Sequence, residues 1–122
     1  TNADQRSGKF GQYYSLQMYY GGYGGNYNST TRFRRYSGDP RGIDDASFRP
    51  EILTEYTDSA HLLIPNHWYH IELSCINGRV QYIINGNRLV DYIDPSPLTS
   101  GWFGFRTTWS RAQITDFSYT AQ

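Results

Sequence analysis

The chain has one cysteine, no net charge, no long apolar run and little helical periodicity. Each of these absences excludes some kinds of protein or partner. The single cysteine, Cys75, excludes an intrachain disulfide. No apolar run approaches the roughly 18 residues of a membrane span, so we expect no membrane insertion. Eleven basic residues balance eleven acidic ones, which argues against a nucleic-acid partner held by bulk attraction of phosphates.

What the chain does contain is typical of β-structure. Short runs of aromatic and β-branched residues recur along the 122 residues, separated by clusters of Gly, Asn, Asp and Pro. This pattern predicts one all-β domain over residues 1–122, with roughly seven or eight short strands in a sandwich or barrel.

In the first half, we expect strands near residues 13–20, 30–36 and 52–56. A loop of glycine and asparagine, running through about Asn28, joins the first two strands, and a polar loop over residues 37–50 follows. Alternation along these strands predicts that Leu16, Met18 and Phe33 lie in the core.

The strand over residues 68–76 has a regular alternation that places Ile71, Leu73 and Cys75 on its core face. Cys75 is therefore expected to be a buried, unreactive thiol. After this strand, Val80 begins a second core-facing alternation.

Two dipeptides, Asn77-Gly78 and Asn85-Gly86, predict tight turns, since both favour positive φ. Further strands are expected over residues 101–108 and 112–119. In the first, Trp102, Gly104, Arg106 and Thr108 are expected on one face and Phe103, Phe105 and Thr107 on the other. Trp102 is expected to pack in the core.

Four motifs in the second half carry a family resemblance: PNHWYHIEL over 65–73, NGRVQYIINGNRLV over 77–90, GWFGFR over 101–106 and ITDFSY over 114–119. In this order they resemble the C-terminal half of the concanavalin A-like lectin/glucanase superfamily, in its laminin-G-like members. The resemblance implies a jelly-roll β-sandwich of antiparallel strands. It also implies a secreted, periplasmic or cell-surface protein.

Two upstream motifs, YYGGYGGN and TTRFRRY, resemble a bacterial branch of that superfamily associated with polysaccharide degradation. Sandwiches of the superfamily have more strands than this chain provides. We therefore expect N-terminal strands to be missing from it. Either a separate chain supplies them as a partner, or they have been lost.

Residues 13–36 hold seven of the twelve tyrosines together with three arginines. Tyrosine rings stack on the apolar face of a sugar, and arginine binds a carboxylate or sulfate with two parallel hydrogen bonds. The expected partner is thus a polysaccharide or oligosaccharide, acidic rather than neutral. The candidate carbohydrate-binding residues are Tyr19, Tyr23, Asn26, Asn28, Arg32, Arg34, Tyr36, Arg106 and Trp109.

The alternative is structural. Tyrosines are good strand formers, and the arginines would then form a solvated strand face with a salt bridge to Asp39 or Glu55. A metal site is not expected, because His67 and His70 are divided between the two faces of their strand. No cofactor is predicted.

By resemblance to lyases of this fold, Tyr20 or Tyr23 would act as acid and base, and Arg34 or Arg106 would neutralise a uronate carboxylate. The chain lacks the Glu-x-Asp-x-x-Glu motif of the superfamily's retaining glucanases, which weakens a glycoside hydrolase. Three functions remain open: a polysaccharide lyase or hydrolase, a non-catalytic carbohydrate-binding module, and a structural or protein-interaction domain.

Overall fold

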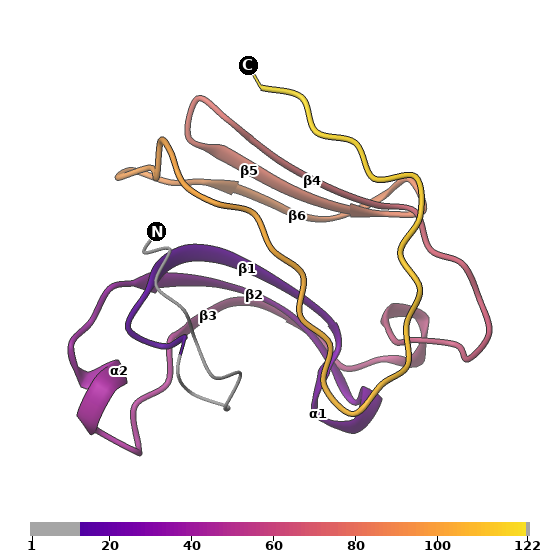
Figure 1. Ribbon diagram of the computed structural model, residues 1–122, viewed down its shortest axis with the longest axis horizontal. Coiled ribbons are helices and arrows are strands. Elements are labelled where there is room, and N and C mark those ends of the chain that lie inside the picture. Colours follow the sequence, from indigo (N-terminus) through magenta and orange to yellow (C-terminus); the bar gives the residue numbers. More distant parts are fainter. Residues whose placement is uncertain (1–12, 122) are drawn as a thin grey trace.

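Two three-stranded antiparallel sheets face each other in the computed structural model, which describes residues 13–121 (Figure 1). One sheet has the order β1-β2-β3 and the other β4-β5-β6. The predicted all-β sandwich is confirmed. The strands are β1 (Gln17–Gly24), β2 (Thr30–Ser37), β3 (Glu51–Tyr56), β4 (Ile71–Ile76), β5 (Arg79–Ile84) and β6 (Asn87–Ile93).

Helices are limited to single turns: α1 (Gly25–Asn28), α2 (Arg41–Asp44) and a 3-10 turn, η1 (Ser59–His61). In α1 the three residues after Gly25 have positive φ, so the turn is left-handed and its asparagines suit it. Within residues 13–121, no helix is long and apolar enough to cross a bilayer.

The first strand lies further along the chain than predicted, since β1 runs through Gly21 and Gly22 to Gly24. The reason lies in the facing sheet. A Cβ on Gly21 would stand 3.1 Å from the ring of Tyr82, so the bare glycine backbone lets this buried tyrosine approach. Gly21 is therefore a packing residue of the strand rather than part of a loop.

The core lies between the sheets, and it forms around the β5–β6 hairpin. Both predicted turns are confirmed: Asn77-Gly78 has φ of 49° and 79°, and Asn85-Gly86 has φ of 51° and 78°. Such turns match the twist of the strands they join. The buried apolar cluster contains Phe33, as predicted, with Val80, Tyr82, Ile84, Leu89 and Val90.

The inner face of β4 is less covered than its sequence predicts. Ile71 and Leu73 are paired with the buried Ile84 and Tyr82, but each is 47% exposed. Cys75 is also exposed, so its predicted burial is wrong. The cause is that β4 is an edge strand whose inner side the described residues leave half open.

The strands predicted over residues 101–108 and 112–119 are not present, and residues 101–121 are exposed throughout. An alternating sequence becomes a strand only where a neighbour accepts its hydrogen bonds, and β1–β6 pair only among themselves. Trp102 is 74% exposed rather than in the core. Within this exposed segment the ring of Phe103 contacts those of Phe105 and Phe117, at 4.8 and 5.5 Å between centroids.

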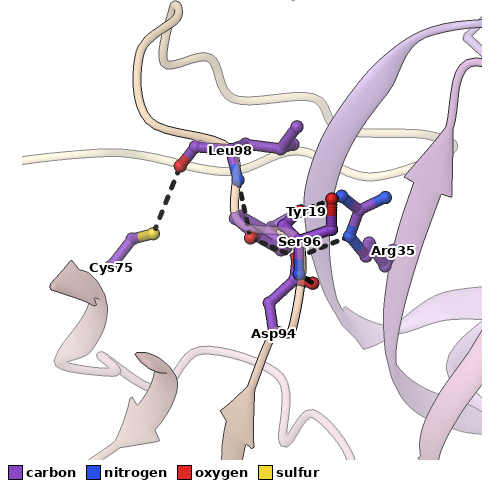
Figure 2. Close-up of polar contacts among 6 residues, drawn as sticks. All are labelled: Tyr19, Arg35, Cys75, Asp94, Ser96 and Leu98. Carbon is purple, nitrogen blue, oxygen red and sulfur yellow. Dashed lines mark hydrogen bonds and ion pairs between the residues drawn. The ribbon is translucent and has the colours of Figure 1, made fainter. Parts of the chain in front are cut away.

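One buried carboxylate joins the two sheets. Asp94, which follows β6, has a side chain only 2% exposed. It accepts hydrogen bonds from the Tyr19 hydroxyl and from Nε of Arg35, both at 2.6 Å, and from the Ser96 amide at 2.8 Å (Figure 2). Tyr19 and Arg35 are cross-strand partners on β1 and β2, so Asp94 ties both of these strands to the end of β6.

The segment after Asp94 is tied to the same partners. Arg35 donates a second hydrogen bond to the Ser96 carbonyl at 2.7 Å, and the Leu98 amide donates to the Tyr19 hydroxyl at 3.1 Å (Figure 2). Burial alone would raise the pKa of Asp94, but the hydrogen bonds from Tyr19, Arg35 and Ser96 outweigh it and lower the pKa. The carboxylate is therefore held in its charged form.

We expect Asp94→Ala to lower the free energy of unfolding by about 3–5 kcal/mol, because it leaves the Arg35 guanidinium half-buried without its carboxylate. Asp91→Ala, which removes the exposed partner of Arg79, should cost about 1 kcal/mol or less. Urea denaturation of the two variants measures both values. Equal losses would contradict the role of Asp94.

A comparison of the wild-type protein with Asp94→Ala at different pH values gives a second test. A folded pKa below the unfolded value of about 3.9 stabilises the fold above that pH and loses its contribution as the pH falls through the folded pKa. The stability difference between the wild-type protein and Asp94→Ala should therefore shrink below about pH 4.

Candidate functional site

Alternation along β1 and β2 gives the first sheet two faces of different chemistry. Phe33 and Arg35 point toward the second sheet, where they meet Tyr92 and Asp94. Arg34 and Tyr36, which alternate with them along β2, point the other way, onto a face that we call the outer face. In Figure 1 the sheet is arched, and this face is its hollow side, turned away from β4–β6.

Tyrosine and arginine alternate on the outer face. Tyr20 of β1 is the cross-strand partner of Arg34 of β2, and its ring lies 5.9 Å from that of Tyr36. Tyr14 meets Tyr36 edge to face at 6.2 Å, and Arg49 lies over the ring of Tyr14 at 5.4 Å.

Arg106 reaches the same area from the C-terminal segment, where its guanidinium lies over Tyr13 at 4.9 Å. Together these residues form what we call the Tyr–Arg cluster: Tyr13, Tyr14, Tyr20, Arg34, Tyr36, Arg49 and Arg106.

Tyr36 is the floor of the cluster and is 5% exposed. Burial, with a contribution from Tyr20, raises its pKa to about 12, although the nearby charges of Arg34 and Arg106 act in the opposite direction. Tyr36 therefore stays neutral across the physiological range. It supports the cluster as a packed ring, on which Tyr14 and Tyr20 rest.

The arginines on and beside β2 have partners of two kinds. Arg32 is held by Glu55, as the structural alternative predicts, and Arg35 by Asp94. Arg34 instead donates to the Pro50 carbonyl at 2.9 Å, and Arg49 donates to two backbone carbonyls. A carbonyl orients a guanidinium without cancelling its charge, so the outer face keeps positive charge beside its rings.

The structure divides the predicted binding residues among several places. Arg34, Tyr36 and Arg106 come together in the cluster, which also contains the catalytic candidate Tyr20. Arg32 lies on the same face but is paired with Glu55.

The other candidates lie elsewhere. Tyr19 points inward to Asp94, and Tyr23 points to the end of the sandwich, where its hydroxyl donates to the Leu62 carbonyl at 3.3 Å. The side chain of Asn28 hydrogen-bonds both the amide and the carbonyl of Leu63, so it has a structural role. Asn26 is exposed in α1, and Trp109 is 93% exposed.

Four residues of these sites were not predicted from the sequence: Asp94, Tyr13, Tyr14 and Arg49. Asp94 begins the run Asp94-Pro95-Ser96-Pro97, whose prolines predict the end of a strand and not a buried carboxylate. Arg49 belongs to the predicted loop over residues 37–50 and Tyr14 to the predicted strand over residues 13–20, and only the folded chain brings them together on the outer face.

No group of three His, Cys, Asp or Glu side chains in the described part of the chain is arranged to hold a metal. His67 hydrogen-bonds the carbonyl of Pro65.

A family model described as "Domain of unknown function (DUF6250)" matches residues 1–117. The chain belongs to the DUF6250 family. No curated protein and no solved structure matches it. The matched part of this DUF6250 domain includes Asp94 and the whole Tyr–Arg cluster, so both belong to the family's domain rather than to an appendage. The family description assigns no activity, and the chemistry of the site must supply it.

Proposed function

We propose that this domain binds an acidic polysaccharide on the outer face of the β1–β3 sheet, through the Tyr–Arg cluster. The observation that carries the proposal is the state of Arg34 and Arg49. Both are oriented by backbone carbonyls, and in the described residues neither has a carboxylate partner. Their charge is therefore available to an anion from outside.

The neighbouring rings support a sugar as the bearer of that anion. Tyr20 lies beside Arg34 on the adjacent strand. A pyranose ring has an apolar face that stacks on tyrosine, while a carboxylate or sulfate at its rim can take both nitrogens of an arginine fork. The hollow shape of the sheet suits an extended chain of such units. The family resemblance of the sequence motifs points to the same ligand class.

We expect Arg34→Ala to weaken binding of a polyuronate by roughly 10- to 100-fold, since one charge-assisted contact contributes about 1.5–3 kcal/mol. Isothermal titration with uronate oligosaccharides measures this. Binding should also weaken as salt is raised, because exposed charges are screened.

Arg88→Ala is the matched control. It removes an exposed arginine of β6, whose partner is Asp91, and should leave affinity unchanged. An equal loss in both variants, or no loss in Arg34→Ala, would refute the site.

Lyase activity is a second candidate, favoured by the direct pairing of Tyr20 with Arg34. Arg34 would neutralise the uronate carboxylate, and Tyr20 would remove the adjacent ring proton. The electron pair left behind forms a carbon–carbon double bond as the bond to the leaving sugar oxygen breaks, and that oxygen takes up the proton that Tyr20 has removed.

The unsaturated product absorbs ultraviolet light, which gives a direct assay on polyuronates. If the domain is a lyase, Tyr20→Phe should lose about 100-fold or more of the rate while it still binds substrate. If the wild-type domain binds polyuronates and releases no such product, it is a binding module without this activity.

A further inference from the structure

A second recess lies at one end of the sandwich, away from the outer face. It has a volume of about 350 Å³ and is walled by Tyr23 of β1, the η1 turn, Tyr69 and the turn between β5 and β6. The volume lies within the range of small-molecule sites, roughly 300–1,000 Å³. The inference that follows does not rest on the function proposed for the Tyr–Arg cluster.

The wall of this recess is aromatic and aliphatic, with a few polar side chains. Tyr23 and Tyr69 meet edge to face at 5.2 Å, and Ile84 and Leu89 form the inner wall. No lysine, arginine, aspartate or glutamate is among the lining residues. A charged ligand would therefore lose its hydration without gaining a counter-charge, and the recess suits a neutral one.

His61 is the most firmly held polar group of the wall. Its ring stacks on Tyr56 with centroids 4.1 Å apart, its Nδ1 lies 2.8 Å from the Asp58 carboxylate, and its backbone carbonyl accepts a hydrogen bond from the Thr31 hydroxyl. The Asp58 carboxylate accepts a hydrogen bond from Nδ1, which fixes the direction of the ring and leaves Nε2 as its other polar atom. The recess thus has one oriented ring nitrogen that can hydrogen-bond a hydroxyl group.

The turn between β5 and β6 supplies amides. Asn85 uses its side-chain oxygen to accept from the His70 amide at 2.8 Å, so its NH₂ group remains a donor. Asn87 also lines the recess, and its side chain makes no hydrogen bond within residues 13–121. A ring nitrogen, amide donors and tyrosine rings around a recess without acidic or basic chains among its described lining residues match a ring that carries several hydroxyl groups.

We propose that this recess binds one uncharged sugar residue, such as the terminal unit of a neutral glycan. Tyr23 and Tyr69 would face the apolar side of the ring, while His61, Asn85 and Asn87 would bond its hydroxyls. The sandwich would then have two carbohydrate sites of different charge preference, one on a sheet face and one at its end.

The test is a titration of the folded domain with a panel of neutral methyl glycosides and neutral oligosaccharides, followed by ligand-detected NMR and calorimetry. Asn87→Ala should weaken binding about fivefold, the effect of one neutral hydrogen bond of about 1 kcal/mol. Ile64→Trp, at a 54% exposed position that lines the recess, should fill it and abolish binding. Thermal melting checks that both variants remain folded.

Arg34→Ala is the control that separates this site from the outer face, since it should leave neutral-sugar binding unchanged. Saturable binding that is lost in Ile64→Trp and kept in Arg34→Ala supports the site. Three results would overturn it: no saturation by any neutral sugar, binding unaffected by Asn87→Ala and Ile64→Trp, or binding only of simple aromatic compounds such as phenol and indole. Parallel titration with polyuronates shows whether the outer face has failed separately.

Discussion

The buried carboxylate of Asp94 is the interaction on which the arrangement of the two sheets depends. It gathers Tyr19 from β1, Arg35 from β2 and Ser96 from the chain beyond β6 at one point between the layers (Figure 2). A charge taken out of water is costly unless each of its lone pairs is satisfied, and here three donors satisfy it. The contact is directional, so it orients the layers more closely than apolar packing alone would.

The position of Asp94 also decides what the outer face can do. Because Arg35 and Tyr19 turn inward to it, strand alternation sends Arg34 and Tyr20 outward as neighbours. Adjacent arginines in one strand thus have opposite roles. Arg35 is half-buried and paired with the Asp94 carboxylate to hold the fold, whereas Arg34 keeps its charge for the surface. The three consecutive β2 residues Phe33, Arg34 and Arg35 supply core packing, surface charge and the junction between the sheets.

Local pattern was enough to predict the parts of the fold that depend on neighbours in sequence. The Asn-Gly turns and the burial of Phe33 and Tyr82 follow from turn chemistry and from period-two alternation. Local pattern could not predict the contacts of Asp94, since Arg35 is 59 residues away along the chain and Tyr19 is 75 residues away.

The errors have the same origin. Cys75 alternates like a core residue and is exposed, because burial depends on what covers an edge strand. For the binding site, alternation placed Arg34 and Tyr36 correctly on one face. It did not predict Arg49, which a loop brings in, and it grouped Tyr19 and Tyr23 with residues that lie on the opposite side of the sheet.

The central claim is that neighbouring arginines of β2 serve opposite faces of the sheet. Its most direct measurement is the arginine side-chain NMR spectrum during titration with an acidic oligosaccharide. The account predicts that the Nε resonances of Arg34 and Arg49 shift and saturate, while that of Arg35, bonded to Asp94, does not move. A saturable shift of Arg35 with Arg34 unmoved, or shifts confined to arginines of the β4–β6 sheet, would contradict it.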